Sequence, residues 1–220
     1  TLAIRRDSTP PPRDDKKSIL ATYASLARMP AMYFGVLMGY ISVLPFTLSG
    51  SFYPVLLVSE GFTSQTTGWL MTLRALGSIV SGVALARLVR EPTGLKLPLW
   101  CTVATSLTMA SAAATGDIWI TGLSILGFGV ASGLGSIYFQ LMIGAVSRPE
   151  DRGAAISFGG LGWQATNITT PLIMGTLMDA FGLRNAFFTI CVSTLAIACA
   201  MPAIHRWALG KSQEIPTASR

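Results

Sequence analysis

Residues 118–147 read IWITGLSILGFGVASGLGSIYFQLMIGAVS, an uninterrupted run without a charged side chain. An α-helix rises 1.5 Å per residue, so about 20 apolar residues cross the ~30 Å hydrocarbon core of a bilayer. This run is therefore long enough to span a membrane as a single helix. Further uncharged runs cover residues 31–59, 97–116, 153–178 and 185–204. The pattern predicts an integral membrane protein.

The composition of the 220 residues agrees with this interpretation. Charged residues make up 12% of the chain, about half of the share usual in soluble proteins, whereas apolar residues make up 51%. We expect an all-α, polytopic membrane protein with six transmembrane helices at about 33–57, 65–88, 97–115, 118–146, 153–178 and 185–205. The second span is the least obvious of the six, because Arg74 interrupts an otherwise apolar run from Trp69 to Leu88.

The positive charges predict how the six spans are oriented. Fourteen of the 16 Lys and Arg residues fall in the amino-terminal segment, in the connections after spans 2 and 4, or in the carboxyl-terminal tail. The alternate connections hold Arg184 alone. Under the positive-inside rule, both termini are cytoplasmic. The basic charge is then a topology signal, and nucleic acid is excluded as a partner.

The sequence argues against an enzyme, a cofactor or a metal centre. The three cysteines lie inside apolar runs without CxxC spacing, and His205 is the only histidine. An intramembrane serine protease would need a histidine facing Ser136, but His205 falls at the cytoplasmic end of the last span. We therefore expect no catalytic residue, no cofactor and no bound metal.

The ends of the chain are predicted to lie outside the membrane. Residues 1–30 are proline-rich and charged, which is typical of a cytoplasmic linker, and residues 207–220 form a cytoplasmic tail. A charged linker that opens directly onto a span suggests that further sequence lies upstream. The six spans also divide into two groups of three. Because three is an odd number, the second group crosses the membrane in the opposite sense to the first, as in an inverted repeat.

Three motifs in the second half of the chain follow one another in order. Pro149 lies shortly before Arg152-Gly153 at the start of span 5, and Pro171-Leu-x-x-Gly175 follows inside that span. The run Asp179-x-x-Gly182-x-Arg184-x-x-Phe187 then closes it. This series resembles the major facilitator superfamily. The segment from Gly82 through Arg87 to Arg90 resembles the family motif G-x-x-x-D-R-x-G-R, with Ala86 in place of the acid and Val89 in place of the glycine.

The resemblance covers residues 31–206 and implies spans seven to twelve of a twelve-helix transporter. The protein would then be the carboxyl-terminal half of a secondary active permease that works by alternating access, with the amino-terminal six-helix half missing. In the family, the helices equivalent to spans 1, 2, 4 and 5 face the translocation path, whereas spans 3 and 6 face lipid.

Polar and aromatic side chains near the bilayer centre are candidates for substrate binding, because polar groups are costly there. The candidates are Arg74, Gln164, Asn167, Tyr40 and Trp163. Arg74 either extends towards the interface, or faces a water-filled cavity, where it binds an anionic group of a small-molecule substrate or pairs with a carboxylate. Interhelical hydrogen bonds are the alternative role for Gln164 and Asn167, and aromatic packing is the favoured role for Tyr40, Phe46 and Tyr53.

A second group of residues has a predicted role in gating or in the structure. It comprises Gly129, Gly133, Arg87, Arg90, Arg152, Asp179 and Arg184. Gly129 and Gly133 form a GxxxG pair that permits close helix packing or a sliding surface for alternating access. Asp179 and Arg184 flank the turn at Gly182, where we expect a left-handed residue and an ion pair across the turn.

No Asp or Glu lies well inside any span. If transport is coupled to a proton, we expect the titrating carboxylate in the missing half. We expect the protein in the bacterial inner (plasma) membrane, in contact with the lipid bilayer. The alternatives that the sequence leaves open are a self-contained six-helix carrier or channel that works as a homodimer, and a membrane scaffold that transports nothing.

Overall fold

The computed structural model describes residues 19–85, 87, 91 and 93–210, and within these ranges all the regular structure is helical. In chain order the helices are α1 (Ile19–Ala27), α2 (Pro30–Ser51), α3 (Tyr53–Ser59), α4 (Ser64–Val80), the π-helical turn η1 (Ser81–Leu85), α5 (Lys96–Ala114), α6 (Ile118–Val146), the 3₁₀ turn η3 (Pro149–Asp151), α7 (Arg152–Gly159), α8 (Leu161–Phe181) and α9 (Leu183–Gly210).

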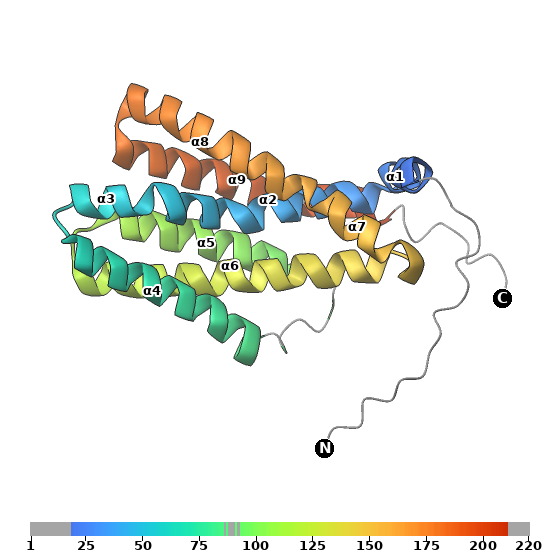
Figure 1. The fold of residues 1–220 in the computed structure, drawn as a ribbon, viewed down its shortest axis with the longest axis horizontal. Helices are drawn as coiled ribbons and strands as arrows, with labels where there is room; N and C mark the ends of the chain where they lie inside the picture. The colour runs from blue at the N-terminus through green and yellow to red at the C-terminus, as the bar shows by residue number, and fades with distance from the viewer. Residues whose placement is uncertain (1–18, 86, 88–90, 92, 211–220) are drawn as a thin grey trace, which may run out of the picture.

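The long helices lie side by side and form one bundle with two distinct ends (Figure 1). At one end, short turns join α3 to α4, α5 to α6 and α8 to α9. We call this the turn end. At the other end lie α1, the start of α7 and the last turn of α9, and we call it the terminal end. The chain crosses from one end to the other six times, as predicted.

The predicted spans agree with the helices, with differences at their ends and in their continuity. The fourth span, 118–146, coincides with α6. The first span is broken after Ser51, where Pro54 starts a new helix, and the fifth is broken at Gly160. The sixth continues to Gly210, into the predicted tail. The second is α-helical to Val80 and then π-helical to Leu85, and its remaining residues fall in the part of the chain that is only partly described.

Four helices of the described chain are long and apolar enough to cross a membrane by length and composition alone: α2, α5, α6 and α9. The other two crossings are less apolar. Helix α4 carries Arg74, and α8 carries glutamine, asparagine and several threonines. Arg74, Gln164 and Asn167 therefore lie on the two less apolar crossings.

The two less apolar helices each pack tightly against one long helix. Helix α4 packs on α6, and α8 packs on α2. In the first pair the Ser78 hydroxyl donates to the carbonyl of Gly129 (3.1 Å), and in the second the Thr166 hydroxyl donates to the carbonyl of Tyr40 (3.0 Å). In both pairs, a hydroxyl on the less apolar helix donates to a backbone carbonyl of the helix on which it packs. This repetition is expected if the chain contains two three-helix units related by inverted symmetry.

Two apolar cores stabilise the bundle. One lies towards the turn end and includes Tyr53, Phe128 and Phe187, whose rings are in contact. The other lies towards the terminal end and includes Phe34 and Tyr138. Aromatic packing, the favoured role for Tyr53, is therefore confirmed.

The short helix α1 lies within the segment predicted to be a linker. It is seen nearly end-on in Figure 1, so it runs across the bundle axis. Leu26 anchors it, because this side chain is buried in the terminal-end core. Tyr33 of α2 also donates a hydrogen bond to the carbonyl of Ala27 at its end (2.8 Å). Residues 1–18 and 211–220 fall outside the described part of the chain.

Candidate functional site

Two neighbouring residues of α2, Phe46 and Thr47, connect this helix to the polar residues of α4 and α8. Neighbouring residues of a helix point about 100° apart, so one can face α4 while the other faces α8. The Phe46 ring lies under the guanidinium of Arg74 on α4. The Thr47 hydroxyl donates to Oδ1 of Asn167 on α8 (2.8 Å). We call the surface formed by Phe46, Thr47, Arg74 and Asn167 the polar face.

Arg74 is half-buried, and its guanidinium carbon lies 4.8 Å from the centre of the Phe46 ring. Such a cation–π contact is worth about 0.5–2 kcal/mol, depending on desolvation. In the described part of the chain, the Arg74 side chain has no carboxylate partner and no hydrogen bond. The guanidinium therefore lies against an aromatic side chain, Phe46, that is itself 63% exposed. In this position the guanidinium can still bind an anion.

Asn167 and Gln164 lie one turn apart on α8, and both are exposed. Since residues three apart share a helix face, Gln164 extends the polar face towards the start of α8. Asn167 accepts the bond from Thr47 through its oxygen, so its amide nitrogen points elsewhere. Asn167 therefore forms an interhelical hydrogen bond and is also exposed on the polar face.

Tyr40 and Trp163 are more engaged in packing. The Tyr40 hydroxyl hydrogen-bonds the Thr169 hydroxyl (3.1 Å), and its ring lines a small cavity of about 110 Å³ between α2, α8 and α9. The Trp163 ring stacks on Phe139 of α6, with centroids 6.5 Å apart. The Tyr40 hydroxyl is therefore engaged with α8, whereas Trp163 remains 40% exposed beside Gln164.

The glycine pair Gly129 and Gly133 lets α4 lie directly against α6. A Cβ on Gly129 would collide with the carbonyl oxygen of Arg74, and one on Gly133 with the Ser81 hydroxyl. The equivalent residue in the other pair is Gly162, where a Cβ would collide with the carbonyl of Val36, and its role was not predicted. It has no second glycine four residues away, so spacing gave no signal for it.

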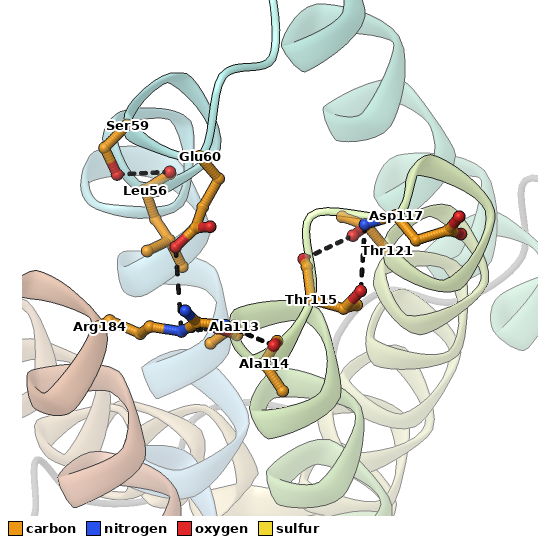
Figure 2. A network of polar contacts seen from close by, with 9 residues as sticks. All are labelled: Leu56, Ser59, Glu60, Ala113, Ala114, Thr115, Asp117, Thr121 and Arg184. Atoms are coloured by element: carbon orange, nitrogen blue, oxygen red, sulfur yellow. Dashed lines mark hydrogen bonds and ion pairs between the residues drawn. The ribbon is translucent and has the colours of Figure 1, made fainter.

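Arg184 does not pair with Asp179, which corrects the expectation of an ion pair across the turn; Figure 2 shows its side chain beside Glu60 and Ala113. Instead Arg184 Nε lies 3.9 Å from Oε1 of Glu60 and donates to the carbonyl of Ala113 (2.9 Å). The guanidinium also donates to the carbonyl of Ala114. Gly182 has a φ of 78°, as predicted, and this turn directs Arg184 towards α5 rather than back to α8. Asp179 is exposed.

Of the other arginines expected to act in gating, Arg152 lies at the terminal end. Arg87 is exposed, and Arg90 lies outside the described residues. Arg152 is exposed in the first turn of α7, with its Nε beside Gly144 of α6. Asp151 precedes α7, but its side chain makes no capping hydrogen bond.

Thr47 was not predicted, because a single threonine in an apolar span is unremarkable in sequence. Phe46 was expected either to line a cavity or, as the favoured role, to pack against other side chains. Both became apparent once the helices placed them against Arg74 and Asn167.

The model of a protein family, described as Major Facilitator Superfamily, matches residues 18–218. No curated protein and no solved structure matches the chain significantly.

Proposed function

The chain belongs to the major facilitator superfamily, a family of membrane transporters, and we propose that it forms the carboxyl-terminal six-helix half of a secondary active permease. In this proposal the missing amino-terminal half packs against the polar face, and the two halves rock about a site near the bilayer midplane. The transported species is a small solute. The two less apolar helices, α4 and α8, support this arrangement, because their exposed polar side chains would be costly against lipid.

The proposed substrate is anionic, and the observation that carries this assignment is Arg74. Its guanidinium lies over Phe46 at 4.8 Å and has no carboxylate partner in the described part of the chain. A cation inside a span requires a counter-charge. A carboxylate or phosphate on the solute would supply it, with Asn167 and Gln164 as neutral hydrogen-bonding groups alongside.

A proton is the proposed coupling ion, and its titrating group lies in the other half. The described spans contain serine, threonine, glutamine and asparagine, but their only acid is Asp179 near the end of α8. The proposed location is the bacterial inner membrane with both termini in the cytoplasm, on the strength of the basic residues at the terminal end.

Transport of organic anions by the full-length protein in proteoliposomes tests this function. The probes are lactate and benzoate, with glycerol and benzyl alcohol as neutral analogues, under an imposed proton gradient. We expect accumulation of an anion but not of its neutral analogue, and a loss of at least tenfold with Arg74→Ala. Arg74→Lys should keep part of the activity, because it keeps the charge but not the planar group.

Two further variants make the test specific. Phe46→Leu should raise the apparent KM for the anion about two- to fivefold, since a cation–π contact at an exposed site is worth about 0.5–1 kcal/mol. Arg28→Ala changes an exposed arginine of the terminal end and should leave transport unchanged. An Arg74→Ala protein with unchanged affinity would remove Arg74 from the substrate site. Failure of both lactate and benzoate to accumulate would argue against this substrate class.

A further inference from the structure

A large cavity lies at the terminal end of the bundle, opposite to the turn end. A cavity of about 940 Å³ opens between the end of α1, the end of α6, η3 and the last turns of α9. Its walls come from four segments that are distant in sequence. It does not include any residue of the polar face, so the inference does not depend on the proposed substrate site.

Aromatic residues indicate that this cavity lies at the level of the lipid headgroups. The Tyr33 ring contacts Phe158 of α7 and Trp207 of α9, with centroids 6.3 and 6.4 Å apart. Tyr33 and Trp207 are each 49% exposed. Tyrosine and tryptophan concentrate at the membrane–water interface, because one part of the ring is apolar and the other is polar. Trp207 directly follows Arg206, which lines the cavity.

Helix α1 closes one side of the cavity at the same level. It runs across the bundle axis in Figure 1, and Tyr23 contacts Phe158 with centroids 6.4 Å apart. A helix in this position lies along the membrane surface rather than through it.

The charged groups of the cavity favour an anion. Arg148 and Arg206 line it, and neither forms an ion pair with a carboxylate of the described chain. Arg206 uses only Nε for a hydrogen bond, to the carbonyl of Pro202 (3.3 Å). Asp151 is the one acid in the lining, and it too is unpaired. His205 donates from Nε2 to the carbonyl of Thr93 (2.8 Å), which fixes its ring at the wall.

The remaining wall is apolar. Leu26, Met29, Val146 and Leu209 line it beside the arginines. A free inorganic ion would gain nothing from contact with this apolar surface. An amphiphile, in contrast, can place its charged group against the arginines and its hydrocarbon chain against the apolar residues. Burial of hydrocarbon is worth about 0.8 kcal/mol per CH₂ group.

We propose that this cavity binds the phosphate headgroup of an anionic phospholipid, held by Arg148 and Arg206, with the start of its acyl chain against Leu26 and Leu209. Arginine is suited to this role, because its fork donates two parallel hydrogen bonds to phosphate oxygens. The predicted topology places the cavity at the cytoplasmic leaflet, where anionic lipids give a negative surface potential.

Native mass spectrometry of the full-length protein, with added phosphatidylglycerol, tests the site. We expect one saturable lipid adduct that phosphatidylcholine does not produce, and a loss of affinity of at least tenfold in the Arg148→Gln/Arg206→Gln double variant. The charge-matched control is Arg28→Gln/Lys96→Gln, which removes two exposed cations of the same end that do not line the cavity. It should bind like the wild type, whereas Asp151→Asn should bind several-fold more tightly.

Three outcomes would overturn the proposal. Equal losses in the two double variants would mean that only the overall charge matters. Displacement of the adduct by 10 mM inorganic phosphate would assign the site to the free ion. The third is an Arg148→Lys/Arg206→Lys variant that loses the lipid entirely while it elutes as a monodisperse protein, since lysine keeps the charge. Retention of the adduct in that lysine variant would support the proposal and show that folding is not the cause of the loss.

Discussion

Arg184 and Glu60 hold the turn end of the bundle together across three helices. Arg184 Nε lies 3.9 Å from Glu60 Oε1, after α3, and the same nitrogen donates to the carbonyl of Ala113 at the end of α5 (Figure 2). The guanidinium thus connects the start of α9 with the last turn of α5 and the end of α3. The carbonyls of Ala113 and Ala114 belong to the last turn of a helix, where no intrahelical donor is available for them.

We expect Arg184→Ala to lower the free energy of unfolding by about 1–2 kcal/mol, because hydrogen bonds from a charged donor are worth about that much at a half-exposed site. Glu60→Gln should lower it by less than about 1 kcal/mol, since an exposed ion pair contributes little. Thermal unfolding of the purified protein in detergent measures both. A larger effect for Glu60→Gln than for Arg184→Ala would contradict the dominance of the carbonyl contacts.

The second prediction concerns the close packing of α4 on α6 and of α8 on α2. A methyl group on Gly129 or Gly162 would collide with the carbonyl oxygen of Arg74 or of Val36. Gly129→Ala and Gly162→Ala should each destabilise the protein by about 1–3 kcal/mol, the usual effect of overpacking. Matched controls lie on the two less apolar helices: Gly68 on α4 and Gly175 on α8 have open space around them. Their alanine variants should unfold at or slightly above the wild-type temperature.

The third prediction concerns orientation. Thr63 is exposed at the turn end and Glu150 at the terminal end. Of the three cysteines, Cys101 and Cys191 are buried, and Cys199 is exposed. In a Cys199→Ser background, a membrane-impermeant maleimide should label Thr63→Cys in intact cells, and Glu150→Cys only after the cells are opened. The reverse labelling pattern would place the termini outside the cell.

The fourth prediction concerns the size of the native protein. If six further spans precede this chain, the intact mass of the protein purified from its own membrane is about twice that of these 220 residues. A mass close to that of the 220 residues alone would instead favour a six-helix protein that works as a homodimer or as a scaffold. This single measurement separates the proposed permease half from both alternatives.

The number and order of the spans could be predicted from the sequence, because each depends on local composition. The uncharged run at 118–147 became α6 within a residue, since the cost of a charge in the bilayer limits where a span can begin and end. The break at Gly160 was not predicted. Whether a glycine interrupts a helix depends on what packs around it, and at Gly160 the flanking α7 and α8 are both held by α2.

The candidate site rests in part on residues that the sequence had singled out, and their role in substrate binding stays a prediction. Arg74, Gln164 and Asn167 drew attention because polar groups are rare in spans, and all three are accessible. Their connection through Phe46 and Thr47 could not be read from the sequence, since it depends on which way α2 is rotated between α4 and α8. The predicted partner of Arg184 was wrong because it, too, depends on the tertiary structure. Asp179 is near Arg184 in the sequence, but Glu60 is near it in space.

The sequence by itself determined that the chain is a helical membrane protein, how many times it crosses the bundle, and which residues carry charge where charge is rare. These properties follow from the hydrophobic run length and from the cost of desolvating a charge, which act on each segment independently. Only the tertiary structure decided which helices touch, that glycine packs α4 against α6 and α8 against α2, and that Arg74 rests on Phe46. Those contacts depend on the rotation of each helix about its axis. In this chain that rotation is set by side-chain packing between segments more than 25 residues apart.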